Sequence, residues 1–513
     1  MSKAPVVQDF ALPVGAVRDF TYESKRRRWF SAILALVALG ATAIFFAYQG
    51  HLARVLILGR HTGINYLDSF YHSAKTHDDL CVGGVSHSGY IGLEGDSEGK
   101  PKRSFFWYFE AQHGPENAPI ILTIGGGPGT SGMINPLFGQ SHCKVSPNLT
   151  THLNPNAWSE HHNLLALDHA HDNAFSQPIG VGYSYGTMVN NSRDAAHDVY
   201  DFLLKFFHLN QFVLASGSYG GIYVPHIATV IHEQNAALAA GRGVPGAIHI
   251  NLESIMISNP LSDWLSHHRW ALHQRCFLTD LYNTSTCHAS FRKLPACLEA
   301  SQMAYMDDTI EHRLIATDAC DSIYPEIVEG RAYENVELHC DGTVEDCYPA
   351  VVRVVAFMNL ASTKEKLGVP DAFNFTFLSE EVGNAFRETG DIVQQAYLLY
   401  EPLLKAGYRL LHYIGKLDAN CGWPGILSTL RLLPSPYQST FNDVLDLPWP
   451  GHEATVRTVG SNNEERNGAG TFAFVLMARA GHLVTHDQPA LVPEIVRRWV
   501  ANIAWNDTLD TMN

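Results

Sequence analysis

Residues 212–225, FVLASGSYGGIYVP, decide the fold of this chain. They pass from a short apolar run through a turn of tiny residues, with Ser218 at its apex, into a helical pattern. This order is typical of a nucleophile elbow, whose sharp turn lifts a serine hydroxyl clear of a sheet and requires small residues two positions away, here Ser216 and Gly220. The pattern predicts Ser218 as a nucleophile and the backbone N–H of Tyr219 as an oxyanion donor. The alternative is an ordinary strand-to-helix turn with a capping serine.

A second stretch, GYSYG at residues 182–186, matches G-x-S-x-G more literally. Pro178 and Gly180 precede it and make a poor strand, and the residues that follow it do not begin a helix. We therefore reject Ser184 as the nucleophile.

Apolar runs and helical patterns alternate along most of the chain, which predicts an α/β fold with a mostly parallel central sheet and helices on both faces. A hairpin is expected within residues 81–110. Further strands are expected at 118–124, 163–168, 252–258, 408–414 and 471–477, with helices at 192–209 and 491–504. The alternation lapses near residue 264, so we interpret residues 264–400 as an inserted cap between two core parts, 76–263 and 401–513.

The N-terminal region predicts a membrane anchor. Four basic residues at 25–28 precede WFSAILALVALGATAIFFAY, residues 29–48, which is about long enough to span a bilayer as a helix. The basic flank predicts a cytoplasmic tail at 1–28, a transmembrane signal-anchor at 29–48 and a juxtamembrane linker at 49–75. The alternative is a cleaved signal peptide with small residues at 41–43. Either segment directs the rest of the chain to the secretory-pathway lumen, the vacuole or the cell exterior.

Three further features fit that compartment. Acidic residues number 51 against 35 basic ones, which argues against a nucleic-acid partner. Six of the nine cysteines lie between Cys276 and Cys347, which predicts a disulfide-stapled insertion and leaves at least one thiol unpaired. Five asparagines begin glycosylation sequons: Asn148, Asn190, Asn283, Asn374 and Asn506.

A serine nucleophile needs a base, and the base needs an orienting carboxylate. In an elbow enzyme these follow the serine in the order acid, then histidine, each in a loop after a strand. Asp418 follows the strand predicted at 408–414, and His482 follows the strand predicted at 471–477. These two residues are the predicted partners of Ser218.

The glycine-rich loop at 125–129 is predicted to supply the second oxyanion donor, because glycine lets the backbone approach the reacting carbonyl group. No Gly-Lys-Ser/Thr follows, so we reject a phosphate-binding loop. Histidine pairs occur at 161–162, at 169 and 171, and at 267–268, but no acidic or cysteine ligands accompany them at metal-binding spacing, so polar surface is expected there. No metal or organic cofactor is predicted.

Several separated motifs resemble the serine carboxypeptidase family of α/β-hydrolases, over residues 75–505. GGGPGTSG at 125–132 resembles N-G-G-P-G-C-S-S, SGSYGGIYVP at 216–225 resembles G-E-S-Y-A-G-x-Y-x-P, and ISNPLSD at 257–263 resembles I-G-N-G. GKLDANCGW at 415–423 and ARAGHLVTHDQP at 478–489 resemble the acid and histidine motifs. The resemblance implies Ser218, Asp418 and His482 as the triad.

The same resemblance implies an oxyanion hole formed by Gly127 and Tyr219, and it matches Cys421 to the family's free thiol near the site. We also expect Gly125, Gly126, Gly217 and Cys421 beside the substrate.

This chain departs from the family at the residues that bind a substrate's terminal carboxylate. The family uses the Asn of N-G-G-P-G and the Glu before the nucleophile, supported by a Trp, whereas this chain has Gly125, Gly217 and Thr123 at those places. The family's Cys is Thr130, and residues 169–176 resemble an insertion. Discrimination for a C-terminal residue should weaken when the groups that bind its carboxylate are lost.

The sequence therefore predicts a serine carboxypeptidase-like hydrolase that attacks a peptide or an acyl ester through an acyl-enzyme. One alternative is an esterase or acyltransferase on the same fold, and a second is a non-catalytic lumenal binding protein. The oligomeric state stays open.

Overall fold

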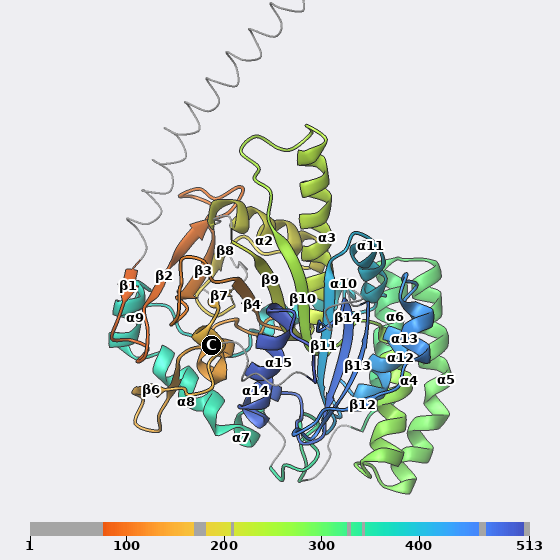
Figure 1. Cartoon of the computed structure of the whole chain (residues 1–513). Coiled ribbons are helices and arrows are strands. Elements are labelled where there is room, and N and C mark those ends of the chain that lie inside the picture. The colour runs from red at the N-terminus through yellow and green to blue at the C-terminus, as the bar shows by residue number, and fades with distance from the viewer. Residues whose placement is uncertain are drawn as a thin grey trace, which may run out of the picture. The chain divides into compact units, whose positions relative to one another are not determined.

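The computed structural model describes residues 75–168, 181–206, 210–325, 330–340, 344–460 and 468–506. Within them runs a twelve-stranded sheet in the order β1-β2-β3-β7-β4-β9-β10-β11-β14-β13-β12, with β8 paired to β3 (Figure 1). The strands are β1 (Lys75–His77), β2 (Ser86–Gly92), β3 (Lys102–Phe109), β4 (Ile120–Ile124), β7 (Asn163–Leu167), β8 (Tyr185–Gly186), β9 (Phe212–Ser218), β10 (Leu252–Pro260), β11 (Arg409–Gly415), β12 (Leu447–Pro448), β13 (Ala454–Val459) and β14 (Phe472–Met477).

The six consecutive strands from β7 to β14 are parallel, and antiparallel strands border them on both sides. The predicted parallel strands form the centre of a mixed sheet, and the antiparallel pair β2 and β3 is the hairpin expected within residues 81–110. The reason is connectivity: β2 joins β3, and β13 joins β14, as antiparallel neighbours, whereas the central strands are linked by longer crossovers that contain helices.

Helices cover both faces of the sheet, as predicted. Successive side chains of a strand point to opposite faces. On β3, Phe106 contacts Phe202 of α2 (Ser192–Phe206), whereas Trp107 packs in the same core as Trp499 of α15 (Leu491–Val500). The two helices therefore lie on opposite faces (Figure 1), and α3 (Gly220–Ala239) packs against α2, β9 and β10.

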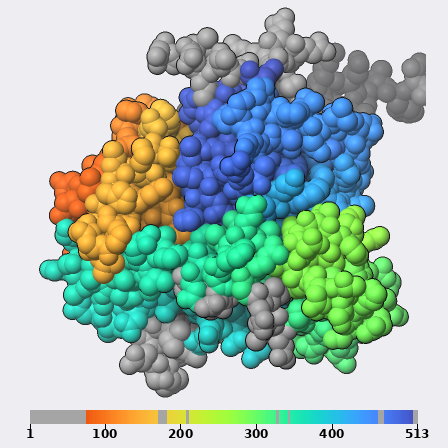
Figure 2. Space-filling model, turned by 90° about the horizontal axis from the view of Figure 1, so that it is seen from below, coloured from red at the N-terminus to blue at the C-terminus, as the bar shows by residue number. Residues whose placement is uncertain are grey.

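Between β10 and β11 the described chain is helical, as expected for the predicted cap. Its segments lie beside the first and last parts of the chain in Figure 2, where they are coloured green to cyan. They are α4 (Trp264–His273), η3 (Gln274–Leu278), α5 (Thr284–Met306), α6 (Ile310–Asp321), α7 (Val344–Cys347), α8 (Pro349–Met358), α9 (Ala361–Leu367), α10 (Glu380–Thr389), η4 (Ala396–Leu399) and α11 (Tyr400–Lys405). The domain boundaries themselves stay a prediction.

The remaining elements lie in the segments between core strands, except α14, which lies between β14 and α15. They are η1 (Pro136–Gln140), β5 (Cys143–Val145), β6 (Thr151–Leu153), η2 (Trp158–Glu160), α12 (Trp423–Leu432), α13 (Gln438–Asp443) and α14 (Val484–Asp487). Strands β5 and β6 pair with each other in a separate antiparallel ribbon.

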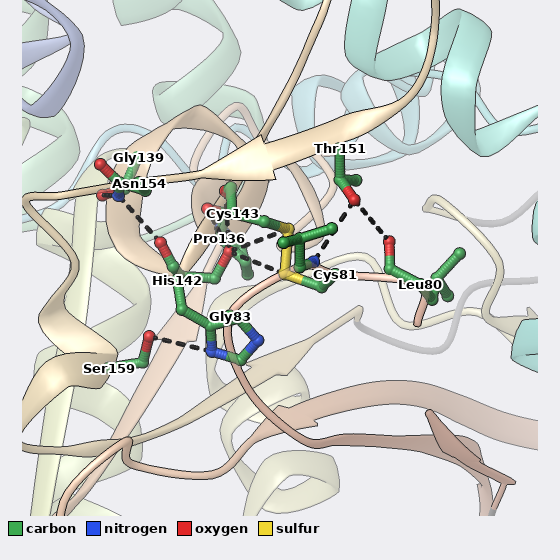
Figure 3. The surroundings of a disulfide bond; sticks show 12 residues. Leu80, Cys81, Gly83, Pro136, Gly139, His142, Cys143, Thr151, Asn154 and Ser159 are labelled. Atoms are coloured by element: carbon green, nitrogen blue, oxygen red, sulfur yellow. Dashed lines mark hydrogen bonds between the residues drawn. A yellow bond between two sulfur atoms is a disulfide. The ribbon is translucent and has the colours of Figure 1, made fainter. Parts of the chain in front are cut away.

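Three disulfides confirm that the predicted insertion is stapled: Cys276–Cys287, Cys297–Cys320 and Cys340–Cys347. A fourth, Cys81–Cys143, joins the chain after β1 to β5 (Figure 3). Beside it, Thr151 of β6 donates a hydrogen bond to the carbonyl of Leu80 and accepts one from the amide of Val82. Cys421 is free and buried, as the family resemblance implied.

The predicted transmembrane segment at residues 29–48 lies outside the described residues, and so do its flanks up to residue 74 and the apparent insertion at 169–176. In the part of the chain that the structure describes, no helix has the length and apolar character needed to cross a bilayer.

Candidate active site

The turn around Ser218 has the geometry of a nucleophile elbow. Strand β9 ends at Ser218, α3 begins at Gly220, and Ser218 has a φ of 58°, a left-handed conformation that is unusual for a residue with a side chain. A β-carbon added to Gly220 would overlap the Ser216 side chain. The predicted strained turn with small flanking residues is therefore confirmed.

The parallel strands bring the predicted partners of Ser218 to the same edge of the sheet. Gly126 and Gly127 follow β4, Asp418 follows β11 and His482 follows β14, so all lie beyond carboxyl ends of parallel strands. Nδ1 of His482 and Oδ2 of Asp418 are 2.7 Å apart, which fixes the orientation of the imidazole ring.

Asp418 is completely buried, and every oxygen of its carboxylate has a donor. Oδ1 accepts hydrogen bonds from the amides of Asn420 and Cys421, and Oδ2 accepts a further one of 2.6 Å from Nδ2 of Asn259. Asn259 lies at the end of β10 with a φ of 41°. Our sequence analysis quoted this asparagine in a family motif but assigned it no role.

The environment of His482 favours a protonated imidazole. Burial lowers its pKa, but the charge of Asp418 and the hydrogen bond to it raise the pKa, with additional contributions from Glu334 and Asp487, and the net effect is a pKa above the ordinary 6.5. Such a histidine accepts a proton readily once it is neutral.

A cap segment holds the loops of Asp418 and His482 together. The carbonyl of Tyr333 accepts from the amide of Ala419, and the carbonyl of Glu334 accepts from the amide of His482 at 2.6 Å. Asn335 donates to Oδ2 of Asp487, which also accepts from the amide of Gly481. This contact of residues 333–335 with both loops was not predicted, because no sequence pattern relates segments so far apart.

The glycine-rich loop lies against the elbow. A β-carbon on Gly126 would lie 3.0 Å from Cβ of Ser218 and 3.1 Å from the amide nitrogen of Tyr219. Glycine at this position therefore leaves the N–H of Tyr219 accessible. On its other side the loop pairs with the cap, since the amide of Ser131 donates to the carbonyl of Phe377 and the carbonyl of Gly129 accepts from the amide of Ser379.

A buried carboxylate anchors the end of the same loop. Oδ1 of Asp168 accepts hydrogen bonds from the hydroxyl of Ser131 and the amide of Gly132. Burial raises the pKa of Asp168 to about 7, against the opposing effect of these donors. The hydroxyl of the rejected Ser184 donates to the carbonyl of Asp168 and accepts from the amide of Phe105, so it is a buried structural group.

A cavity of about 600 Å³ lies over these residues. Six of the predicted site residues line it: Gly126, Gly127, Gly217, Ser218, Tyr219 and His482.

The other predicted residues, Asp418, Cys421 and Gly125, do not line the cavity. Asp418 lies behind His482, and Cys421 is buried, with its backbone amide donating to Oδ1 of Asp418. Gly125 is not among the described lining residues, because its α-carbon faces the carbonyl of Thr130 within the loop.

The two positions that lost the family's carboxylate-binding side chains have no room for them. Gly217 is paired in register with Ser258 of β10, and a β-carbon on Gly217 would lie 2.6 Å from Oγ of Ser258. A β-carbon on Gly125 would overlap the carbonyl of Thr130. The hydroxyl of Ser258 and the carbonyl of Thr130 therefore occupy the space that a glutamate at position 217 or an asparagine at position 125 would need.

The expectation that the histidine pairs form polar surface is wrong for His162 and His268. Both are buried, with Nδ1 of His162 against the carbonyl of Trp158 and Nδ1 of His268 against the hydroxyl of Tyr324. His268 lies within ligand distance of Cys297 and Cys320, but these two cysteines form a disulfide and offer no thiolate to a metal. The pair at 169 and 171 lies outside the described residues.

All five sequon asparagines, from Asn148 to Asn506, are exposed. Asn283 also caps α5 through its side-chain oxygen, which leaves its nitrogen available. Their exposure is compatible with glycosylation.

Comparisons with known proteins agree on one group of enzymes. A family model described as serine carboxypeptidase matches residues 78–502. Carboxypeptidase Y homolog A from Ajellomyces capsulatus is 28% identical over 455 residues, covering 86% of this chain and 78% of the relative. A vacuolar serine-type carboxypeptidase of Saccharomyces cerevisiae is 28% identical over 421 residues, covering 79% and 78%.

Among solved structures, Kex1(Δ)p, a prohormone-processing carboxypeptidase from Saccharomyces cerevisiae, superimposes with a TM-score of 0.63. The two are 20% identical, and the match covers 82% of this chain and 91% of the other, which supports a shared fold.

Proposed function

The chain belongs to the serine carboxypeptidase family, and we propose that Ser218, His482 and Asp418 are the catalytic triad with which it hydrolyses peptide bonds. As a member of that family it is a serine-type carboxypeptidase-like hydrolase. The observation that carries the proposal is the 2.7 Å contact between His482 and Asp418 at the wall of the cavity that Ser218 also lines. No cofactor is needed for this chemistry.

In the proposed first half-reaction, Oγ of Ser218 attacks the carbonyl carbon while its proton passes to Nε2 of His482. Nδ1 of His482 is held by Asp418, so Nε2 is the nitrogen left to accept this proton. The Ser218 hydroxyl must point toward Nε2 of His482 for this transfer, and such hydrogen bonds often tighten only when substrate binds. The oxyanion receives hydrogen bonds from the N–H groups of Gly127 and Tyr219.

Collapse of this intermediate breaks the C–N bond, and the leaving amine takes the proton from His482. The product is an ester of Ser218. Water then attacks that ester and gives a proton to His482, which returns it to the oxygen of Ser218 as the carboxylic acid leaves. The enzyme is unchanged at the end of the cycle.

A fluorophosphonate probe tests the triad directly. Wild type should be labelled, and Ser218→Ala should not be, because the probe reacts only with an activated serine. Ser184→Ala is the matched control and should be labelled like wild type in its folded fraction. Equal labelling of wild type and Ser218→Ala would disprove the triad, and no labelling of folded wild type would favour a non-catalytic binding protein.

A second candidate is an esterase or acyltransferase, in which an alcohol or amine replaces water. The crowding at Gly217 and Gly125 favours it, since neither position can carry a side chain to bind a terminal carboxylate. Transfer of the acyl group to an added alcohol, without cleavage of any peptide, would identify this reaction.

We place the catalytic domain in the lumen of the secretory pathway or in the vacuole. Four disulfides and five exposed sequon asparagines support that compartment, and one relative is named a vacuolar enzyme. The signal-anchor at residues 29–48 stays a prediction.

A further inference from the structure

A second cavity, of about 250 Å³, lies beside the active-site cavity, and Phe138 of η1 contributes to the walls of both. Four of its lining side chains can carry a positive charge: Lys144, His152, Arg353 and His486. No aspartate or glutamate is found among the described residues that line it. Because the chain as a whole has a net charge of -16, a cavity whose charged lining is purely basic indicates a site that attracts an anion.

The cavity lies where segments from distant parts of the chain meet. Helix α8 packs against η1 and β5, and α14 packs against η1 (Figure 1). Lys144 of β5 is paired in register with His152 of β6. The Cys81–Cys143 disulfide holds the residue directly before Lys144 (Figure 3). The backbone that carries Lys144 is therefore anchored on both sides.

Lys144 and Arg353 have no carboxylate partner among the described residues. Both side chains are partly buried. Burial lowers the pKa of the Lys144 ammonium group, and no nearby carboxylate opposes this effect. Nε of Arg353 has no hydrogen-bond acceptor. Because a partly buried cation without a counter-ion is unfavourable, an anion bound in this cavity would supply the interactions that these two groups lack.

The first turn of α8 adds a further attraction for an anion. Ala350 lies in that turn and Arg353 follows one turn later, and both line the cavity. The positive end of the helix dipole lies at the first turn. Helix N-termini bind phosphate groups through this charge and their unpaired N–H groups. The same helix thus supplies two features that favour a phosphate.

The two histidines add donors to the cavity when they are protonated. Nδ1 of His152 contacts the hydroxyl of Ser146 at 2.9 Å, and Nδ1 of His486 contacts Oδ1 of Asp487 at 3.1 Å. Nε2 of each ring has no partner in the described part of the chain and stays available to a ligand. The other oxygen of Asp487 accepts two hydrogen bonds, one from the cap and one from the histidine loop, which offset part of its charge.

We propose that this second cavity binds the phosphate group of a small molecule such as a phosphate monoester. Lys144 and Arg353 balance the two negative charges of that group, and an arginine beside a helix N-terminus suits its oxygens. The apolar side chains of Leu137, Val145 and Val354 also line the cavity and would contact the organic part of the ligand. The ligand would touch η1 and α14, which line the active-site cavity as well.

The test is titration calorimetry of the full chain with phenyl phosphate, inorganic phosphate and phenol at constant ionic strength. Phenyl phosphate should bind about tenfold more tightly than inorganic phosphate, because its ring gains apolar contact. Equal affinities would identify free phosphate as the ligand. Phenol lacks the charged group and should not bind.

Variants locate the binding site. Lys144→Met and Arg353→Met each keep an apolar stem and should weaken the binding of phenyl phosphate at least about tenfold, since each removes a charged hydrogen-bond donor. The controls are Lys100→Met and Arg242→Met, two exposed residues that do not line the cavity, and they should bind like wild type. Ser218→Ala should also bind like wild type, because the site does not depend on the proposed triad.

A measurement on wild type removes the dependence on folded variants. Phenyl phosphate should slow the acetylation of Lys144 by acetic anhydride, followed by mass spectrometry, and should leave the acetylation of Lys100 unchanged. The proposal is overturned if wild type binds neither phosphate, if Lys144→Met and Arg353→Met bind like wild type, or if Lys144 is not protected. Weaker binding by Ser218→Ala would place the ligand in the active-site cavity and would also overturn it.

Discussion

Gly217 and Ser258 face each other on adjacent parallel strands, and the hydroxyl of Ser258 occupies the space that a side chain at position 217 would need. The serine carboxypeptidase family resembled by this chain has Glu and Gly at the same two places. In this chain the larger residue of the pair is on β10, at Ser258, instead of on β9, at position 217. The carboxylate that would bind a substrate's terminus is therefore absent. Restoring a glutamate at position 217 would therefore also require a smaller residue at position 258.

Gly217→Ala should destabilise the fold by about 1–3 kcal/mol, because the new methyl group would lie 2.6 Å from Oγ of Ser258. The double variant Gly217→Ala, Ser258→Gly should recover much of this loss. Denaturant unfolding of the three proteins measures the coupling. Gly99→Ala, where no atom lies within 4 Å, is the control and should change stability little. Additive effects of the two substitutions would contradict the steric interpretation.

Activity should rise with pH through a pKa above 6.5, since His482 must be neutral to accept the proton of Ser218 and its pKa is raised. Glu334→Gln removes a negative charge that stabilises the imidazolium form. The pKa of His482 should therefore fall, and the acid limb of the kcat/KM profile should move to lower pH. Glu98→Gln, at an exposed site, should leave the profile in place. A shift to higher pH in Glu334→Gln would refute this electrostatic role.

Gly481→Ala should misplace His482 without unfolding the protein. A β-carbon there would overlap the carbonyl of Glu334 and lie 2.5 Å from Cβ of Asn335, so the cap segment at 333–335 would be pushed away from the histidine loop. We expect kcat to fall about 10- to 100-fold, the effect of displacing a catalytic group by about an ångström. The rate of fluorophosphonate labelling measures the change, and a rate equal to that of wild type would show that this contact does not position His482.

One thiol per chain should be found after denaturation without reductant, and it should be Cys421, because the other eight cysteines are paired. In the native protein this thiol should resist iodoacetamide at neutral pH. Burial raises its pKa well above 9.0, with a further contribution from the charge of Asp418, so little thiolate forms. Mass spectrometry of alkylated peptides checks both statements, and rapid native alkylation at Cys421 would contradict them.

The protein made in a eukaryotic secretory host should carry N-glycans at exposed sequons. Digestion with an endoglycosidase should lower its apparent mass, and replacing all five asparagines with glutamine should abolish the shift. Asn283→Gln alone should also cost about 1 kcal/mol of stability, because it removes the N-cap of α5. No mass shift in wild type would argue against a lumenal domain.

Much of the candidate active site could be predicted from the sequence, because the patterns that mark its residues each lie within a short stretch of chain. The elbow at Ser218 is a short run of small residues between a strand and a helix, and Asp418 and His482 each follow an apolar run by a few residues. Such patterns reflect what the backbone requires at those points. The order of the strands in the sheet was not predicted, since it depends on which distant segments pair.

The sequence by itself predicted the nucleophile, the order of its partners and the glycine loop, and it shows the absence of the family's carboxylate-binding side chains. Only the tertiary structure decided that Asn259 and the cap segment at 333–335 hold the loops of Asp418 and His482, and that Ser258 fills the space beside Gly217. These are contacts between residues far apart in the sequence. They arise when separate segments pack against one another, and no periodicity or spacing along the chain records that packing.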